Sequence, residues 1–76
     1  MGRVKTFPAR GALARLTPRQ REVLALMAEG KSNKEIAKEL GLAAGTVKIH
    51  VSSIFKALNV NNRTLAVIAA RESATA

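Results

Sequence analysis

Side chains able to contact nucleic acid gather between residues 41 and 58, which read GLAAGTVKIHVSSIFKAL. Amines and hydroxyls bond base edges and phosphates, and an aliphatic side chain can contact the methyl group of thymine. The run offers all three kinds of group and contains no acidic residue to repel phosphate. An ordinary solvated surface helix could have the same composition, so the flanking elements must decide. The candidates are Lys48, Ile49, Ser52, Ser53 and Lys56.

The apolar residues of the same run recur at the spacing of one helix face. They stand at i, i+4, i+7, i+8 and i+11, as Val47, Val51, Ile54, Phe55 and Leu58. Such a stripe indicates a helix that packs one side on a core and turns its polar side outward. Ile49 lies off this stripe, where an aliphatic side chain has little structural purpose. The pattern suits the major groove of DNA, and the flanking elements decide between this interpretation and an ordinary surface helix.

Composition limits the chain to one small helical domain. It has 76 residues, 47% of them hydrophobic, with two phenylalanines as the only aromatic residues. Alanine-rich, aromatic-poor sequences favour packed helices over a strand-rich barrel. Cysteine is absent, which excludes a disulfide framework and cysteine-based zinc sites. No run of apolar residues is long enough to span a membrane.

The charge is strongly positive and unevenly spread. Thirteen Lys and Arg residues face five acidic ones, for a net charge of +8. Such an excess implies a polyanionic partner, either nucleic acid or an anionic membrane surface. All five acids are glutamates, and none lies before Glu22 or between Gly41 and Arg71. Two acid-free segments therefore flank an acid-bearing middle.

Two capping boxes predict the helices that precede the basic run. Thr17 with Gln20 predicts a helix over about 18–29, and Ser32 with Glu35 predicts a shorter helix over 33–40. A glycine follows each helix and can adopt the left-handed conformation of a helix end. The short helix, a tight turn and the amphipathic helix over 44–58 form a helix-turn-helix pattern.

A fourth helix is expected over 63–72, with Asn62 as its cap. Its residues 65–70 are all apolar and cover the whole circumference of a helix. One side can pack on the domain, and the rest needs a partner unless exposed alanines are tolerated. We expect a homodimer face that includes Leu65, Ile68 and Ala69.

Residues 1–15 are interpreted as a basic arm or linker, and residues 16–76 as the folded domain. The start also fits three other patterns: an N-myristoylation site, an organelle transit peptide and an arm for the minor groove.

Several segments together carry a family resemblance. They are LTPRQREVL from Leu16, Gly30, SNKEIA from Ser32, TVKIH from Thr46 and NRT from Asn62. In this order and spacing they resemble the LuxR/FixJ-type DNA-binding domain of bacterial quorum-sensing and response regulators. The resemblance implies an all-α, four-helix domain whose third helix enters the major groove and whose fourth helix pairs with its twin. It implies base contacts from Lys48, Ile49 and Ser52, and phosphate contacts from Asn33, Lys34, Thr46, His50 and Lys56.

A few positions depart from the family pattern. Gln20 replaces the usual acid but preserves the capping box, whereas Ala43 replaces a serine cap and costs about 1 kcal/mol of capping. Leu65 replaces a commonly polar residue, which favours the dimer interpretation. Arg63 could contact phosphate or tie the last turn to the core.

The resulting hypothesis is a sequence-specific, double-stranded DNA-binding module of a bacterial transcription regulator, acting in the cytoplasm as a homodimer on DNA. RNA polymerase and an upstream receiver or ligand-binding domain are further candidate partners. A promoter-reading region of a sigma factor is the alternative, and a membrane-surface module is a more distant one. We expect no enzymatic activity and no cofactor, because the chain has no cysteine, no Asp and one histidine, and caps and solvent explain its glutamates. We expect no metal site, because the single histidine, His50, has no companion ligands.

Overall fold

The computed structural model describes residues 12–75, which form a short 3-10 helix and four α-helices. The elements are η1 (Ala12–Arg15), α1 (Pro18–Ala28), α2 (Asn33–Leu40), α3 (Ala44–Leu58) and α4 (Arg63–Thr75). No strand occurs within this part of the chain. The predicted all-α fold with a helix-turn-helix is confirmed. Most of the expected basic arm, residues 1–11, lies outside the described residues.

The observed helix bounds differ from the expected ones at two ends. Helix α1 ends at Ala28, because Glu29 already serves as its C-cap. Helix α4 continues to Thr75 rather than stopping at residue 72, since the sequence after Glu72 contains no glycine or proline to end it. The bounds of α2 and α3 are as predicted.

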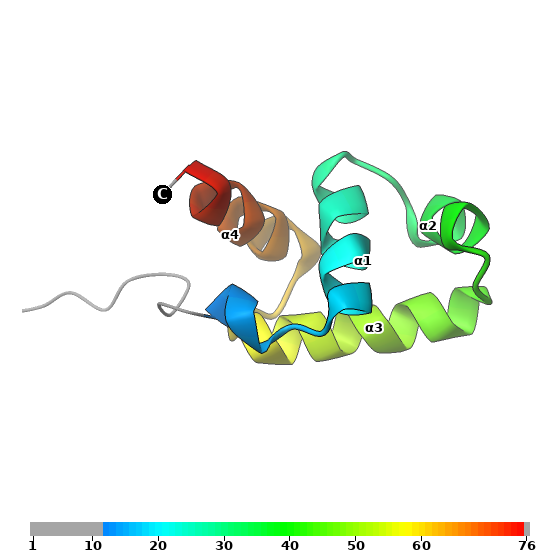
Figure 1. Cartoon of the computed structure of the whole chain (residues 1–76), viewed down its shortest axis with the longest axis horizontal. Coiled ribbons are helices and arrows are strands. Elements are labelled where there is room, and N and C mark those ends of the chain that lie inside the picture. The colour runs from blue at the N-terminus through cyan, green and yellow to red at the C-terminus, as the bar shows by residue number, and fades with distance from the viewer. Residues whose placement is uncertain (1–11, 76) are drawn as a thin grey trace, which may run out of the picture.

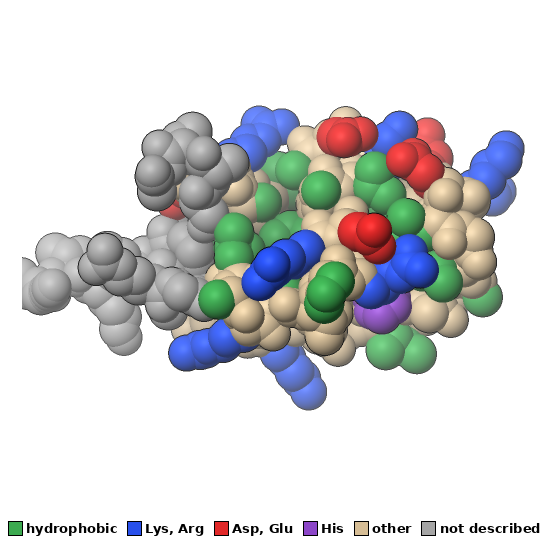
Figure 2. Space-filling model, viewed as in Figure 1, with side chains coloured by type: hydrophobic (Ala, Val, Ile, Leu, Met, Phe, Trp, Pro, Cys, Tyr) green, Lys and Arg blue, Asp and Glu red, His purple; other side chains and the backbone are tan. Residues whose placement is uncertain are grey.

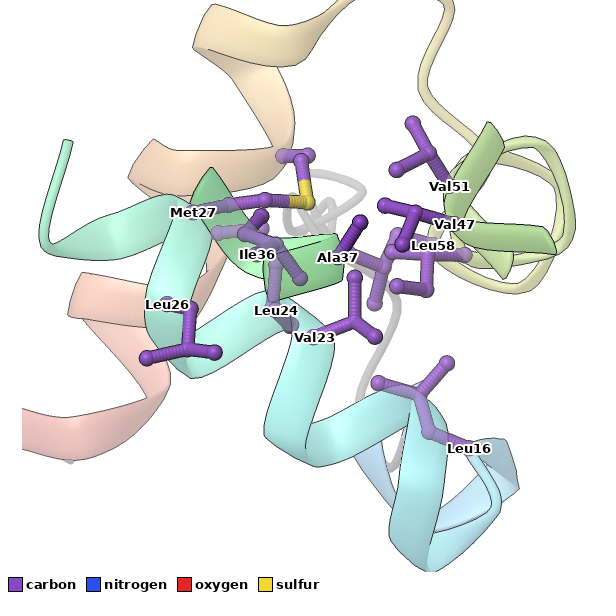
Figure 3. Packing of buried hydrophobic residues seen from close by; sticks show 13 residues of the cluster. Leu16, Val23, Leu24, Leu26, Met27, Ile36, Ala37, Val47, Val51 and Leu58 are labelled. Carbon is purple, nitrogen blue, oxygen red and sulfur yellow. The ribbon is translucent and has the colours of Figure 1, made fainter. Parts of the chain in front are cut away.

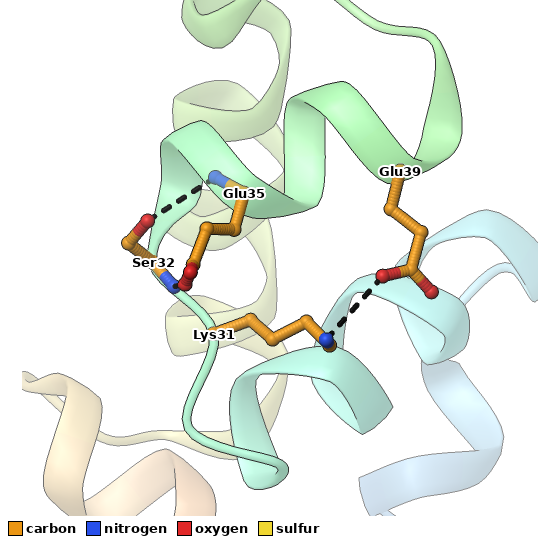
Figure 4. A network of polar contacts seen from close by, with 4 residues as sticks. All are labelled: Lys31, Ser32, Glu35 and Glu39. Atoms are coloured by element: carbon orange, nitrogen blue, oxygen red, sulfur yellow. Dashed lines mark hydrogen bonds and ion pairs between the residues drawn. The ribbon is translucent and has the colours of Figure 1, made fainter.

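Both predicted capping boxes are present. The backbone N–H of Thr17 donates to Oε1 of Gln20 at 3.0 Å, and the N–H of Gln20 donates to Oγ1 of Thr17 at 3.1 Å. The N–H of Ser32 donates to Oε1 of Glu35 at 2.8 Å, and the N–H of Glu35 donates to Oγ of Ser32 at 3.1 Å (Figure 4). These bonds satisfy backbone donors that a helix start leaves without partners.

Left-handed residues end α2 and α3. Gly41 has φ of 69° and Asn59 has φ of 58°. Glycine adopts this conformation freely, and asparagine tolerates it better than most residues. Asn62 then caps α4, because its Oδ1 accepts from the N–H of Leu65 at 2.9 Å.

The core lies between α1, α2 and α3 and continues beneath α4. Side chains from α3 point toward those of α1 and α2 (Figure 3). Helix α4 contributes two fully buried alanines, Ala66 and Ala69. Buried core residues are Leu16, Val23, Leu24, Leu26, Met27, Ile36, Ala37, Val47, Val51, Ile54, Leu58, Ala66 and Ala69.

The arrangement leaves one long side of α3 uncovered. Helices α1, α2 and α4 all lie on the same side of α3 in Figure 1, with α2 near its start and α1 crossing its middle. Helix α4 packs mainly on α1 and also on α3. The opposite side of α3 meets no other helix of the domain in this view.

Candidate nucleic-acid interface

The free side of α3 carries the side chains that the sequence proposed as base readers. Lys48, Ile49 and Ser52 are all exposed, while Val47 and Ile54 on the core side are fully buried. Ile49 is 67% exposed, the highest value among the exposed large hydrophobic side chains of the described residues. At this exposure Ile49 packs little against the core, and most of its side chain is accessible to another molecule.

Lysines stand on this face without acidic neighbours on the same helix. Lys48, Ser52 and Lys56 are spaced by four residues and follow one line along the exposed side. Neither lysine forms an ion pair with a described residue. Lys56 thus lies in line with the proposed base readers.

Acidic side chains gather elsewhere on the molecule. In Figure 2 red side chains lie over α1 and α2, whereas the lower edge, along α3, shows blue side chains and no red. Two of the glutamates are paired: Arg19 with Glu22 at 3.2 Å, and Lys31 with Glu39 at 3.6 Å. In this view the α3 edge shows basic side chains and no acidic ones, a distribution that suits a polyanion.

One edge of the exposed face of α3 is lined by small polar side chains. Thr46, His50 and Ser53 are half-buried and spaced at i, i+4 and i+7. They form a second line beside the exposed one. Serine and threonine hydroxyls are common partners of phosphate oxygens in protein–DNA contacts.

The start of α2 supplies the remaining phosphate candidates. Lys34 is exposed, while Asn33 is half-buried and its Oδ1 accepts from Nη1 of Arg63 at 2.9 Å. Arg63 also donates from Nη2 to the backbone carbonyl of Lys31. Of the two roles considered for Arg63, the structure shows the tie to the domain.

The capping box at the start of α2 favours the ionised form of its glutamate. Hydrogen bonds from the backbone and side chain of Ser32, with a smaller contribution from the charge of Lys31, lower the pKa of Glu35 below its usual value. Glu35 is therefore ionised at neutral pH. Its carboxylate is engaged with Ser32 (Figure 4).

Helix α4 exposes less of its apolar run than expected. Ile68 is 40% exposed and Leu65 is half-buried, but Ala69 has no exposed surface because it packs in the core. The side chain of Ala69 is thus unavailable to a second copy, and its expected place in a dimer face does not fit this burial.

An arginine that the sequence did not single out also holds α4 in place. Arg71 donates from Nη2 to the carbonyl of Ala28, the last residue of α1, at 3.1 Å. The two residues are 43 positions apart, so no local sequence pattern predicts this hydrogen bond.

The described residues give no support for a metal site or a membrane-spanning helix. No group of three His, Asp or Glu side chains among the described residues is placed to hold a metal ion. Within the same residues, no helix combines the length and the apolar character needed to cross a membrane.

Residues 14–70 match the family described as bacterial regulatory proteins, luxR family. The match begins within η1 and includes most of α4. The chain belongs to the LuxR family. The resemblance seen in the sequence is thereby confirmed, and the exposed side of α3 is the free face of a LuxR-family helix-turn-helix domain.

Curated relatives of this LuxR-family domain are named as regulators. It is 47% identical over 57 residues to the transcriptional regulatory protein DesR of Bacillus subtilis, covering 75% of this chain and 29% of DesR. It is 47% identical over 58 residues to LiaR of the same organism, covering 76% of this chain and 28% of LiaR. It is 50% identical over 58 residues to the glycerol metabolism activator of Pseudomonas putida, covering 76% of this chain and 26% of that protein. The chain thus matches less than a third of each relative's length.

Proposed function

We propose that this LuxR-family domain binds double-stranded DNA sequence-specifically, with α3 in the major groove. The observation that carries the proposal is the free face of α3. There Lys48 and Ser52 offer donors beside Ile49, which is 67% exposed, and α3 has no acidic residue. Lysine commonly contacts guanine edges, and an aliphatic side chain suits a thymine methyl. Helix α3 has 15 residues, so it is about 22 Å long, enough to lie along a groove.

Backbone contacts in this proposal come from two places. Lys34 and Asn33 at the start of α2 meet phosphates on one side of the groove, aided by the positive end of the helix dipole. Thr46 and His50 meet them from the edge of α3, and Lys56 acts near its end. These contacts hold the domain on any duplex, whereas Lys48, Ile49 and Ser52 select the sequence.

Pairing of two domains completes the proposed complex. Ile68 and Leu65 offer an apolar surface on α4, 40% exposed at Ile68. Two copies joined there would bind half-sites about one helical turn apart.

The wider role follows from the relatives. DesR and LiaR are named as transcriptional regulatory proteins, and their matched portions are small. We infer that this domain is the DNA-binding part of a transcription regulator that also contacts RNA polymerase and an upstream receiver or ligand-binding domain. The sigma-factor alternative is less favoured, because the LuxR-family match extends through residue 70, inside α4.

The test compares two truncations on α3 with matched truncations elsewhere. Duplexes selected from a random pool define the preferred sequence, and binding is then measured on preferred and scrambled duplexes. Lys48→Ala and Ile49→Ala should each weaken binding to the preferred duplex by about 5- to 150-fold and reduce the preference for the selected sequence. Lys34→Ala should weaken both duplexes equally and lower the slope of log Kd against log salt by about 0.9.

Ile68→Ala is the control for Ile49→Ala, because both remove the same atoms from an exposed isoleucine. It can alter pairing but should leave the preferred bases unchanged. If Lys48→Ala and Ile49→Ala both preserve affinity and preference, α3 is not the reading helix.

A further inference from the structure

Arg63 joins two parts of the domain that are distant in sequence. Its Nη1 donates to Oδ1 of Asn33 at 2.9 Å, and its Nη2 donates to the carbonyl of Lys31. These contacts cross 30 and 32 residues, and both are partly buried. Arg63 is the first residue of α4, so the start of α4 is bonded directly to the turn that leads into α2.

The bond to Lys31 fixes the peptide unit that enters α2. The carbonyl of Lys31 and the N–H of Ser32 belong to one planar peptide group. Arg63 holds the carbonyl end, and Oε1 of Glu35 accepts from the N–H end at 2.8 Å (Figure 4). With both ends bonded, this peptide cannot rotate without breaking a hydrogen bond. The direction in which α2 starts is therefore set jointly by Arg63 and Glu35.

The bond to Asn33 fixes which end of its carboxamide faces Arg63. A guanidinium has only donors, so Arg63 can donate to the amide oxygen of Asn33 but cannot form a hydrogen bond with its NH₂ group. The Nδ2 group of Asn33 makes no hydrogen bond with a described residue, so its two hydrogens are left for another acceptor. Without Arg63 the amide could turn over and present its oxygen, which a phosphate would repel.

Lysine could not replace arginine in this arrangement. The planar guanidinium places two N–H groups in a fixed fork, so one side chain can meet an amide oxygen and a carbonyl together. A lysine ammonium carries its three N–H groups on one nitrogen at the end of a flexible stem and lacks this planar fork.

We propose that Arg63 is a positioning residue for DNA binding, which orients the amide of Asn33 so that its NH₂ group donates to a phosphate. The inference rests on the proposed function, because it assigns the Asn33 contact to duplex DNA. On this inference, the phosphate contact made by the start of α2 depends on the start of α4, the helix proposed to pair two domains. Arg63 itself does not touch the phosphate.

The test is a double-mutant cycle on a scrambled duplex, with binding followed over a range of salt concentrations. Asn33→Ala and Arg63→Ala should each weaken binding about tenfold, as expected for loss of one hydrogen bond to a charged group. The double variant should lose about tenfold in total rather than about a hundredfold. Because neither residue neutralises a phosphate, the salt slope should stay unchanged in all three, unlike that of Lys34→Ala. Arg63→Lys should bind like Arg63→Ala.

Asn33→Asp separates orientation from stability. The carboxylate should pair with Arg63 and preserve the thermal midpoint, yet it should bind duplex more weakly than Asn33→Ala because an oxygen now faces the phosphate. The inference is overturned if losses in the cycle add, if Arg63→Ala lowers the salt slope by about 0.9, or if Asn33→Asp binds like the wild type. Failure of the wild-type protein to bind any duplex would overturn the proposed function and this inference together.

Discussion

Glu35 and Gln20 occupy the same position in two capping boxes that differ in charge. Each accepts from the backbone N–H of its cap residue, at 2.8 Å for Glu35 and 3.0 Å for Gln20. Only Glu35 can titrate, and its bonds to Ser32 favour the ionised form and lower its pKa. The start of α2 should therefore respond to acid, whereas the start of α1 should not.

Glu35→Gln should make the stability of the domain less sensitive to acid. Because the folded state lowers the pKa of Glu35, its ionisation stabilises the fold above the ordinary glutamate pKa of about 4.3. That contribution is lost as the pH falls through the lowered pKa. Urea denaturation from pH 7 to pH 3 should show this part of the acid loss in the wild type and not in the variant.

Gln20→Glu is the reciprocal control, because it places a carboxylate in the same geometry at α1. It should add an acid-sensitive contribution of the same sign. Identical acid profiles for the wild type and Glu35→Gln would contradict the assignment of this titration to the capping box.

At the level of elements, α3 begins without a side-chain cap. Ala43 occupies the N-cap position and makes no side-chain hydrogen bond there, although its carbonyl accepts from the N–H groups of Thr46 and Val47. The first turn of α3 is thus less firmly held than the first turns of α1 and α2. This turn includes Gly45 and Thr46, which border the proposed reading face.

Ala43→Ser should stabilise the domain by about 1 kcal/mol, because a serine hydroxyl at the cap can accept from a free backbone N–H of the first turn. The thermal midpoint should rise by about 4–8 °C. Ala44→Ser, one position later and inside the helix, is the control and should not raise it. Equal thermal midpoints for the two variants would contradict the prediction that a missing side-chain cap at position 43 lowers the stability of the domain.

The periodicity of α3 was enough to predict its exposed face. Side chains three or four residues apart share a side of a helix whatever surrounds it, so the separation of Val47 and Val51 from Lys48 and Ser52 followed from spacing alone. The structure adds the second line of Thr46, His50 and Ser53, which is half-buried because it borders the packed side.

On the scale of the whole molecule, two exposed isoleucines mark two different surfaces. Ile49 lies on α3 and Ile68 on α4, at 67% and 40% exposure. The proposed function assigns the first to DNA and the second to pairing of two domains. These roles can be separated by giving each position the same change.

Ile68→Glu should weaken self-association, because two carboxylates would meet at the apolar contact, while leaving contacts within one domain intact. Ile49→Glu should leave self-association unchanged and weaken binding to every duplex, because it places a carboxylate against the DNA. Sedimentation velocity of the free protein and duplex binding would measure the two effects. Equal sedimentation of Ile68→Glu and wild type at concentrations where the wild type dimerises would contradict the pairing surface.

The sequence by itself determined the features that depend on neighbouring residues. The capping boxes at Thr17 and Ser32, the end of α2 at Gly41 and the amphipathic face of α3 all rest on interactions within about four positions. Such interactions are the same in any context that allows a helix, so their residue types suffice to predict them.

Only the tertiary structure decided how α4 sits on the domain. Its run of apolar residues has no polar side to indicate a direction, so packing against α1 and α3 selected Ala66 and Ala69 as buried and left Ile68 exposed. The two hydrogen bonds from the guanidinium of Arg63 to Asn33 and Lys31 likewise join residues 30 and 32 positions apart. Contacts at that separation depend on where whole helices are placed, and no local spacing encodes them.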